Sequence, residues 1–480
     1  MIAARRAPVV NPARLVAGID LGSTGMKMLV TDETGHEVAV AQVPTPWRSG
    51  PGGTTEMDAG ELLAAVRTLV TTAAGRVAAV TDAPIEAVAL AGMGETGMLI
   101  DSHGAPVAPA YAWFDPRGAD QAAAFPPRLR ADFAGRTGLP LGAQVSVAKL
   151  AYLRDQGVRL DRARWLNLPE FVATALGADP VSEYSLTSRT GLLDQDTGRP
   201  WPEMLRCLGV DETFLPPLVA AGTPVGLAGG PAASGFQDGA GGFAPVEWLP
   251  ANVMGAILTV AGHDHLVAAE ASGGLPPDHY HVSLGTAEVL LRVIDGPLGF
   301  EARCRLAEHL INEVRHVVPG KHVLVAGVKT GLLLRRVLQT AGIHDRAGRD
   351  ALDAAAMSIP YEGGLPDDAI EVAGARNDDG VLKLTVRADG VSPAEVFGAV
   401  LRHSNDEIAL LIEAMDRELP AAATSTLTGG WAGMASVRRA RAQVLPPMTA
   451  STREEETAYG ATRAAARLLS TTPPMIGTAP

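Results

Sequence analysis

The sequence predicts an α/β fold made of two similar domains, and three observations lead to this prediction. The chain has 480 residues, more than one hydrophobic core usually serves, so two domains of about 200 to 250 residues are expected. Short apolar strands alternate with segments of helical periodicity, which is typical of sheets covered by helices. A glycine-containing hairpin near residue 20 has a counterpart near residue 285, which indicates that the two halves are built alike.

The first hairpin is the stretch VAGIDLGSTGMKMLV, residues 16–30, in which two apolar strands flank a glycine-containing turn. The turn offers backbone N–H groups, the hydroxyls of Ser23 and Thr24 and the carboxylate of Asp20. Such groups suit a nucleotide phosphate and its divalent cation. The spacing matches neither a Walker loop nor a dinucleotide fingerprint, so an ordinary turn remains an alternative on this stretch alone.

The second hairpin is HVSLGTAEVLLRV, residues 281–293, again a strand, a glycine with a hydroxyl residue, and a strand. Aligning Gly22 with Gly285 gives an offset of 285 − 22 = 263 residues, more than half of the chain. Two such loops facing one another could hold a polyphosphate from both sides.

Helix signals occur in both halves. Asp58 with Glu61 three residues later forms a capping box at the start of a helix. Ser392, Pro393 and Glu395 mark a second helix start, and a final helix is expected from about 453 to 469, with Glu454 in its acidic first turn.

Composition limits the possible partners. The net charge is −13, and no long Lys/Arg block is present, which argues against nucleic acid. The two cysteines, Cys207 and Cys304, lie far apart in the sequence and fit a reducing cytoplasm. Neither a secretory leader nor a run of some 18 apolar residues appears, so we expect a cytoplasmic protein without a membrane partner.

Residues 215–250 are rich in Gly, Pro and Ala and carry few charges. They read equally well as a linker or as a surface loop insertion in the first domain. We place the domain boundary at the far end of this stretch, with domains at 1–258 and 259–480.

Between this stretch and the second hairpin lies ILTVAGHDHLVAA, residues 257–269, where a strand ends at a glycine and Asp264 follows. A carboxylate at this position, next to the expected domain boundary, is well placed to accept a proton from a substrate hydroxyl. Capping of the following helix is the alternative role for Asp264.

Five ordered motifs resemble the FGGY carbohydrate kinases over about residues 14–469: GIDLGSTGMK, AYAWFDPRGAD, GHDH, SLGTAE and LTGGWAGM. The resemblance implies two domains of the actin-like, ribonuclease H-like type, each with a mixed β-sheet and flanking helices, around an interdomain cleft. The N-terminal domain would carry the first phosphate loop and the sugar side. The C-terminal domain would carry the catalytic aspartate, the second phosphate loop and the adenosine loop.

The resemblance also assigns roles to single residues. Asp264 would be the general base toward a primary hydroxyl, and Asp20 would hold magnesium through water. ATP and its phosphates would contact the hydroxyl and glycine residues of the loops: Ser23, Thr24, Gly285, Thr286, Gly331, Gly429 and Gly430. Positions that line or support the substrate cleft would be Glu95, Thr96, Trp113, Asp115, Arg117 and His265.

The implied activity is ATP-dependent phosphorylation of a sugar or polyol of about three to six carbons. The arginine that glycerol kinases place before the Glu-Thr pair is Gly94 here, which argues against glycerol itself. The Gln-Met-His segment of xylulose kinases is likewise missing at 94–96. A homodimer stays an open alternative for the assembly.

Two other functions stay open at this point. A catalytically silent sugar and nucleotide sensor of the same fold is the first. The second is a zinc enzyme that uses nitrogen ligands from His263, His265, His279 and His281, although alternate histidines at a strand end more often satisfy local hydrogen bonds.

Overall fold

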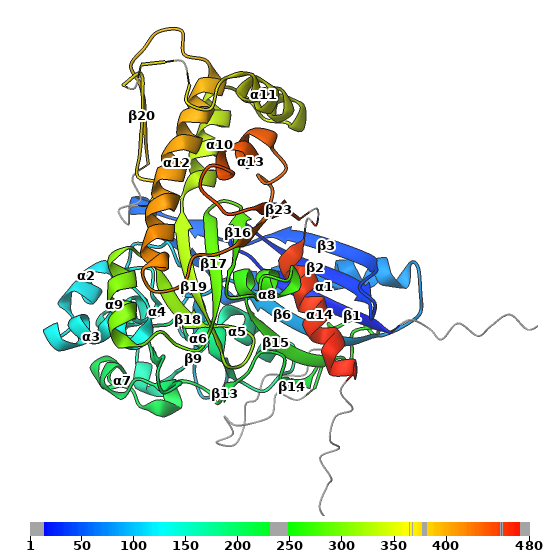
Figure 1. Ribbon diagram of the computed structural model, residues 1–480. Helices are drawn as coiled ribbons and strands as arrows, with labels where there is room; N and C mark the ends of the chain where they lie inside the picture. Colours follow the sequence, from blue (N-terminus) through cyan, green and yellow to red (C-terminus); the bar gives the residue numbers. More distant parts are fainter. Residues whose placement is uncertain are drawn as a thin grey trace, which may run out of the picture.

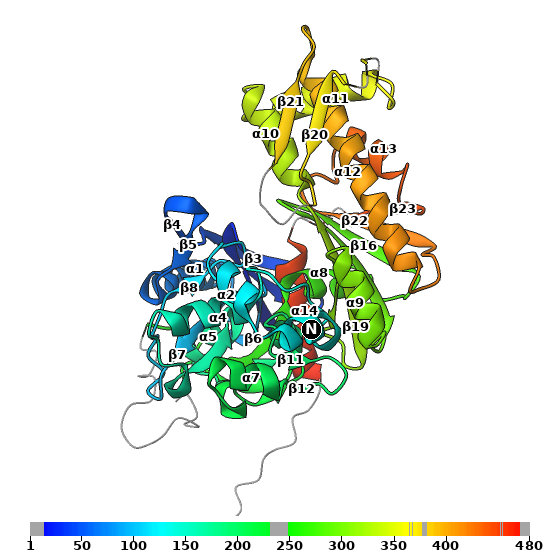
Figure 2. The same cartoon turned by 90° about the vertical axis from the view of Figure 1, so that its left-hand side faces the viewer.

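The computed structural model describes residues 14–230, 248–363, 365, 366, 368–376, 382–451, 453 and 455–470. Two six-stranded sheets, one from each half of the chain, form the framework (Figure 1). Figures 1 and 2 show a lower body around the first sheet and an upper lobe that stands clear of it.

The first sheet has the strand order β14-β15-β6-β1-β2-β3. Its strands are β1 (Leu15–Leu21), β2 (Gly25–Asp32), β3 (Glu37–Pro44), β6 (Ile85–Gly92), β14 (Pro224–Leu227) and β15 (Ile257–His263). Strands β1, β2 and β3 pair antiparallel in sequence, whereas β6 lies parallel to β1 and β15 parallel to β6. The central strands are buried on both faces, which accounts for their continuous apolar character.

The second sheet has the order β18-β19-β17-β16-β22-β23. Its strands are β16 (His279–Leu284), β17 (Glu288–Asp295), β18 (Asn312–Arg315), β19 (Lys321–Val328), β22 (Thr424–Thr428) and β23 (Met448–Ala450). Here β16, β17 and β19 form the antiparallel part, and β22 and β23 add in parallel beside β16.

With β14 and β18 set aside, the two sheets share one order of five strands: β3-β2-β1-β6-β15 in the first sheet corresponds to β19-β17-β16-β22-β23 in the second. The hairpins β1/β2 and β16/β17 occupy equivalent places in this order. The prediction of an α/β fold with two similar, mixed-sheet domains is confirmed.

Helices flank both sheets. Those of the first half are α1 (Ala59–Ala78), α2 (Ala119–Ala124), α3 (Pro127–Thr137), α4 (Ser146–Asp155), α5 (Leu168–Ala175), α6 (Tyr184–Thr187) and α7 (Pro202–Leu208). Those of the second half are α8 (Asp264–Ala271), α9 (Phe300–Glu308), α10 (Thr330–Thr340), α11 (Arg346–Ser358), α12 (Pro393–Asp416), α13 (Ala435–Arg441) and α14 (Glu456–Ser470).

Short strands complete the architecture: β4 (Arg48–Ser49), β5 (Thr55–Met57), β7 (Gly97–Ile100), β8 (Ala110–Tyr111), β9 (Arg164–Asn167), β10 (Ser182–Glu183), β11 (Leu193–Asp194), β12 (Arg199–Pro200), β13 (Leu218–Val219), β20 (Ile370–Ala373) and β21 (Lys383–Val386). Helices α10 to α13 and the hairpin β20/β21 make up the upper lobe in Figures 1 and 2.

Both predicted capping boxes mark real helix starts. The Asp58 side chain accepts a hydrogen bond from the Glu61 N–H at 3.1 Å at the start of α1. At α12, Ser392 and Glu395 exchange side-chain and backbone hydrogen bonds in both directions. These contacts satisfy N–H groups that the first turn of a helix leaves without intrahelical partners.

The chain returns to the first sheet at its end. Helix α14 begins at Glu456 rather than near 453, and Glu454 lies outside the described residues. It packs on β1, β6 and α8, as Figure 1 shows. A Cβ on Gly18 of β1 would lie 2.1 Å from the Ala458 carbonyl oxygen, so glycine allows this close approach.

The Gly/Pro-rich stretch contributes to the first sheet. Its described part includes β13 and β14, and β14 pairs with β15 at the sheet edge. Residues 231–247 lie outside the described part of the chain. For these residues, both the linker and the loop insertion stay predictions. Strand β15 crosses the boundary predicted at 258, because it pairs with β6 as far as His263. The first sheet thus extends past that boundary, and the domain bounds 1–258 and 259–480 stay a prediction.

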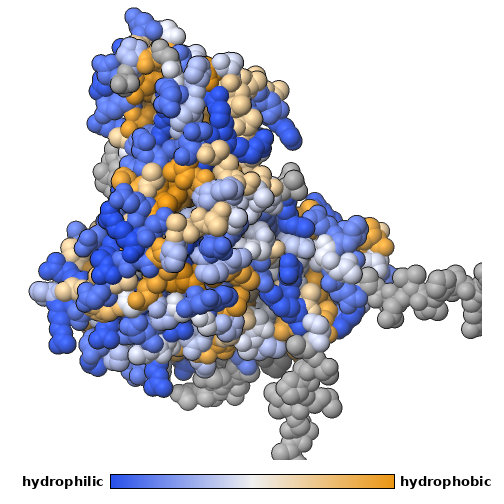
Figure 3. Space-filling model, in the orientation of Figure 1, coloured by the Kyte–Doolittle hydropathy of each residue, from blue (hydrophilic) through white to orange (hydrophobic). Residues whose placement is uncertain are grey.

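The face shown in Figure 3 is largely hydrophilic, with hydrophobic side chains gathered in smaller patches. Among the described residues, no helix combines the length and apolar character needed to cross a membrane.

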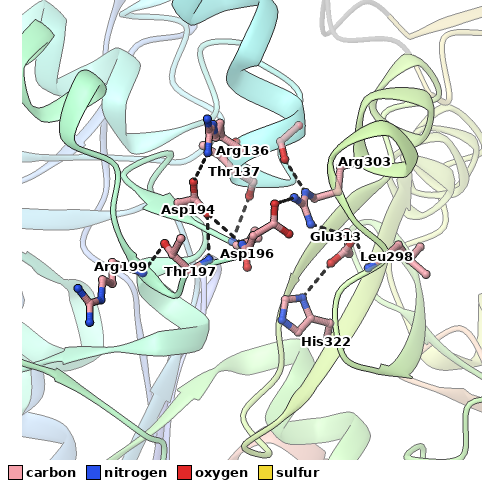
Figure 4. Close-up of polar contacts among 12 residues, drawn as sticks. Arg136, Thr137, Asp194, Asp196, Thr197, Arg199, Leu298, Arg303, Glu313 and His322 are labelled. Carbon is pink, nitrogen blue, oxygen red and sulfur yellow. Dashed lines mark hydrogen bonds and ion pairs between the residues drawn. The ribbon is translucent and has the colours of Figure 1, made fainter.

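A buried polar cluster joins segments of the two halves (Figure 4). Arg303 of α9 is fully buried, donates from Nε to the Gly135 carbonyl at 2.6 Å and from Nη2 to Asp196 at 2.7 Å. Glu313 of β18 lies 3.8 Å from Arg303 Nη1 and 2.9 Å from Nδ1 of His322. The cluster therefore fixes α9 and β18 against the chain around α3 and β11.

We expect Arg303→Met to destabilise the protein by about 3–5 kcal/mol, because it leaves the buried carboxylate of Glu313 without its cationic neighbour. The matched control is Arg305→Met on the same helix, whose pair with Glu418 has an arginine side chain 58% exposed and should contribute less than about 1 kcal/mol. Urea denaturation of both variants measures the difference. Equal losses of stability would contradict the assigned role of the cluster.

Candidate active site

Asp264 lies at the carboxyl end of β15, where α8 begins. The pairing of β15 with β6 shifts register between Val260 and Gly262, and Gly262 has φ +109°, a conformation that favours glycine. A Cβ on Gly262 would lie 2.6 Å from the Ser185 hydroxyl, which accepts a hydrogen bond from the His263 N–H at 3.0 Å. This local geometry turns the chain so that Asp264 becomes the first residue of α8.

The register of the sheet brings Asp264 near Asp20. Asp20 of β1 pairs with Ala91 of β6, and Ala91 pairs with Gly262 of β15. The three strands are parallel, so the two carboxylates lie on the same side of the sheet, at the carboxyl ends of its strands. Ligands of open α/β sheets bind at that edge.

The two carboxylates have opposite pKa shifts. Burial, and next the negative charge of Asp264, raise the pKa of Asp20 to about 8. Burial would also raise the pKa of Asp264, but the imidazoles of His265 and His263 and the His265 N–H, at 2.7 Å from Oδ1, hold it below its usual value. The helix N-terminus favours negative charge there as well. Asp264 is thus the group that is ionised at neutral pH.

The histidines beside Asp264 differ in exposure. His263 is buried, and burial lowers its pKa to about 3, so its ring is neutral when Nε2 lies 3.3 Å from Asp264. His265 has a side chain 36% exposed, with Nε2 4.0 Å from the same oxygen. His265 therefore sits on the open side of the carboxylate.

Asp20 fits the proposed cation site. Its Oδ1 is buried, and no hydrogen-bond partner reaches it among the described residues. A buried carboxylate oxygen without a partner costs free energy that a cation or its bound water would offset.

The first hairpin loop is held from outside. Thr45 donates from its hydroxyl to the Gly22 carbonyl at 2.6 Å, and Trp47 donates from Nε1 to the Ser23 carbonyl at 2.7 Å. Thr24 is exposed, and Ser23 is half-buried. Sequence reasoning missed Thr45 and Trp47, since they follow β3 and carry no motif.

Two glycines from other segments of the chain pack closely against the backbone of the second loop. A Cβ on Gly331 of α10 would lie 2.0 Å from the Gly285 carbonyl oxygen, and one on Gly429 would lie 2.6 Å from the Leu284 carbonyl oxygen. Arg335 donates from Nη2 to the Thr286 hydroxyl at 3.1 Å. Gly430 has open space around it. Four of the predicted nucleotide-binding residues, Gly285, Thr286, Gly331 and Gly429, therefore lie together at the second loop.

Glu95 and Thr96 lie between β6 and β7. Glu95 has φ +60°, which is uncommon for a residue with a side chain and recurs at functional sites. The Ser146 hydroxyl donates to its carbonyl at 2.8 Å, and Arg189 Nε donates to its Oε1 at 2.7 Å. Thr96 is fully buried, and its hydroxyl has no partner among the described residues.

Asp115 and Arg117 pair with each other and hold neighbouring segments of the first half together. Asp115 is buried and accepts from the Thr55 N–H at 2.6 Å and from the Arg117 N–H and guanidinium at 2.7–2.9 Å. Burial would raise the pKa of Asp115, but these hydrogen bonds lower it below its usual value. Arg117 also donates to Glu56 at 2.7 Å and stacks 3.8 Å from the Tyr111 ring. A direct substrate contact for this pair stays a prediction.

Trp113 belongs to a partly exposed aromatic group. Its side chain is 38% exposed, and its ring meets Phe114 edge-on at 5.3 Å, while Phe114 lies 6.3 Å from Trp47. Since Trp47 also holds the first loop, this group connects Trp113 with Ser23. An exposed aromatic face suits the apolar side of a small ligand.

The histidine-rich segment gives no zinc site within the described residues, because no group of three or more His, Cys, Asp or Glu side chains there could hold a metal ion. His279 Nδ1 lies 2.8 Å from the Thr424 hydroxyl, and His281 Nδ1 lies 3.0 Å from the Ser272 hydroxyl. These histidines make local hydrogen bonds.

A separate hollow lies between α11, α12 and α13. Residues Tyr361, Arg402 and Ser436 are among those that line it. None of the predicted ATP or substrate residues lines this hollow. Within the described part of the chain, no hydrogen bond or ion pair joins the first and second loops, and their facing one another stays a prediction.

The strand order and the duplicated hairpins define the chain as a two-domain protein of the actin-like, ribonuclease H-like class. Residues 15–238 match the sequence model of the FGGY family of carbohydrate kinases, N-terminal domain. The match supports the resemblance inferred from the motifs over residues 15–238.

Individual relatives agree with this assignment. The chain is 32% identical over 225 residues to the glycerol kinase of Rhizorhabdus wittichii, covering 43% of each chain. It is 30% identical over 283 residues to the xylulose kinase of Streptomyces coelicolor, covering 57% of this chain and 53% of the relative. The chain thus spans about half the length of the curated relatives it matches. The crystal structure of Plasmodium falciparum glycerol kinase with ADP superimposes with a TM-score of 0.79 at 15% identity, covering 95% of this chain and 90% of that one, which shows the same fold.

We expect Asp20→Asn to stabilise the protein without magnesium by about 1–3 kcal/mol at pH 8, because the amide removes a charge that burial disfavours and whose Oδ1 has no hydrogen-bond partner among the described residues. Folding raises the pKa of Asp20 from 3.8 to about 8, so its destabilising effect is absent below pH 4 and grows as the pH rises toward 8. Urea denaturation at pH 4 and pH 8 measures both values.

The matched control is Asp32→Asn at the other end of the same hairpin. Asp32 accepts from the Thr34 N–H at 2.9 Å and the His36 N–H at 3.0 Å, and these bonds keep its pKa low. Its replacement should leave stability unchanged or lower it. A loss of stability at pH 8 in Asp20→Asn would contradict the unpaired state of this carboxylate.

Proposed function

We propose that the chain is an ATP-dependent kinase that transfers the γ-phosphoryl group to a hydroxyl of a small sugar or polyol of about three to six carbons. The observation that carries the proposal is the pair of carboxylates at one sheet edge, one ionised and one left without a partner. Phosphoryl transfer needs this combination of a proton acceptor and a cation site.

The comparisons support the same class of activity. The relatives that match 43% and 57% of the chain are named glycerol kinase and xylulose kinase, so their substrates are a polyol and a sugar. The structural neighbour from Plasmodium falciparum holds ADP. Which sugar or polyol this chain takes follows from pocket residues that lie on separate segments.

In the proposed mechanism, Asp264 accepts the proton of the attacking hydroxyl. Its low pKa keeps it ionised, and its position at the start of α8 aims it from a rigid element. Glu95 and the exposed face of Trp113 would hold the acceptor, with His265 beside the base. A well-placed base of this kind contributes about 10²- to 10⁴-fold.

The nucleotide would bind at the second loop. The close approach of Gly331 to Gly285 and of Gly429 to Leu284 leaves backbone uncovered by side chains, which suits a polyphosphate and a nucleoside. Ser23 and Thr24 would contact the phosphates from the first loop. Magnesium, when bound at Asp20, would neutralise charge on the transferring phosphate.

A catalytically silent sensor of the same fold is the second candidate. The ionised state of Asp264 and the partnerless oxygen of Asp20 favour the kinase over it. The two candidates differ in ADP release, because a sensor would bind ATP without acceptor-dependent turnover.

We expect Asp264→Asn to lower kcat by about 10²-fold or more while the affinity for ATP stays nearly unchanged, because only the proton acceptor is lost. Coupled-assay kinetics and calorimetry with a non-hydrolysable ATP analogue measure the two quantities. Undiminished turnover would remove Asp264 from the mechanism.

We expect Gly331→Ala to weaken ATP binding at least tenfold, since the new methyl group would lie 2.0 Å from the Gly285 carbonyl and displace the second loop. Gly327→Ala, on the neighbouring strand β19, is the matched control because nothing lies within 4 Å of its added Cβ. Titration with the ATP analogue compares the three proteins. Parent-like affinity in Gly331→Ala would place the nucleotide elsewhere.

A further inference from the structure

Arg189 lies in the space beside Gly94. It follows α6 in the chain, about 95 residues after Gly94, and no sequence motif connects the two. A Cβ on Gly94 would lie 2.9 Å from Cγ of Arg189 and 3.3 Å from Cδ2 of His263. The glycine therefore leaves room for a guanidinium that comes from a different segment.

The Arg189 side chain is 10% exposed and has an incomplete set of partners. Nε donates to Glu95 Oε1 at 2.7 Å, and Nη2 donates to the same oxygen. Nη1 is buried, and no hydrogen-bond partner reaches it within the described part of the chain. Since a buried donor without a partner costs about 1–3 kcal/mol, a ligand oxygen is the expected partner.

The second carboxylate oxygen of Glu95 is also available. Both bonds from Arg189 go to Oε1, and the contact from Ser146 goes to the Glu95 carbonyl. Oε2 therefore accepts no hydrogen bond from the residues that the structure describes. The Arg189–Glu95 pair thus has one donor, Nη1, and one acceptor, Oε2, that make no hydrogen bond within the described part of the chain.

Charged groups of both signs surround this pair. Arg189 is compensated by Glu95, and it is close enough to Asp264 and His263 to influence their pKa values. Lys149, which lies near Glu95, donates to the carbonyl oxygens of Asp115 and Ala143. An anionic group of the acceptor would meet the carboxylates of Glu95 and Asp264, while Arg189 is paired with Glu95 and the Lys149 ammonium group donates to carbonyl oxygens.

We propose that Arg189 is a substrate-binding residue which, together with Glu95, selects a neutral polyol or sugar over a sugar acid. Nη1 donates to the oxygen of one acceptor hydroxyl, and the proton of that hydroxyl is donated to Glu95 Oε2. A hydroxyl can make both bonds, whereas a carboxylate only accepts and would lie against Glu95. The inference rests on the proposed function, because it describes the acceptor of that same site.

Matched acceptor pairs test the selection directly. D-Glucitol with D-gluconate, and xylitol with xylonate, differ within each pair only in a hydroxymethyl against a carboxylate group. Calorimetric binding with the non-hydrolysable ATP analogue, and ADP release with ATP, are measured for each compound. We expect the neutral member of at least one pair to bind at least tenfold more tightly than its acid. Tighter binding of the acids, or no binding of any of the four, would overturn the inference.

Variants separate substrate contact from a structural role. Arg189→Lys keeps the charge beside Glu95 but removes Nη1, and we expect a rise in Kd and KM for the neutral acceptor of at least tenfold with little change in ATP-analogue affinity. Gly94→Ala, which displaces the side chain of Arg189, should raise the same constants. Arg305→Lys on the surface of α9 is the control. Parent-like acceptor binding in Arg189→Lys would overturn the inference.

The double variant Arg189→Met/Glu95→Gln removes both charges of the pair, so it leaves no uncompensated buried charge if a single variant fails to fold. It should fold and yet lose acceptor binding. Binding of a neutral acceptor that depends on Arg189 but yields no ADP would leave the inference standing and refute the kinase. Turnover that is insensitive to substitution of Arg189 would support the kinase and overturn the inference.

Discussion

The rest of the site depends on the electrostatic relation between two carboxylates at one edge of the first sheet. Asp20 and Asp264 lie on β1 and at the end of β15, and β6 joins them in register through Ala91. Each negative charge disfavours the other, so the pKa values of the two carboxylates differ. The helix N-terminus and His265 favour the charge on Asp264, whereas burial disfavours it on Asp20. In the proposed mechanism, Asp264 would then be ready to accept a proton, and a cation would favour ionisation of Asp20.

The surrounding architecture preserves this relation. Gly262 turns the chain into α8, and Gly18 lets α14 pack against β1, so both carboxylates are supported by regular elements. The Arg303 cluster joins the two halves by buried polar contacts (Figure 4). Rigid support of this kind is what a phosphoryl-transfer site needs, because positioning and charge neutralisation provide most of the rate enhancement.

Much of this arrangement was predictable because it is encoded locally. The two hairpins, the helix starts at Asp58 and Ser392 and the glycine before Asp264 all have short-range signals, and the structure contains each of them. Strand β15 was predicted at its observed place, but the sheet that it joins was not predictable, because apolar periodicity does not tell which sheet a strand joins. Long-range partners were not predictable either. Arg189 meets Glu95 across 94 residues, and Trp47 holds Ser23 only through the fold. The bracing role of Asp115 and Arg117 likewise follows from contacts with Thr55 and Glu56 that no spacing rule shows.

The central claim is that this sheet edge transfers a phosphoryl group to a small polyhydroxy acceptor. The most direct measurement is mass-spectrometric detection of a phosphorylated acceptor after incubation of the protein with ATP, magnesium and a panel of three- to six-carbon sugars and polyols. The account predicts one or a few monophosphate products, with ADP formed in equal amount. Stable ATP and unmodified acceptors throughout the panel, although the ATP analogue still binds, would contradict it.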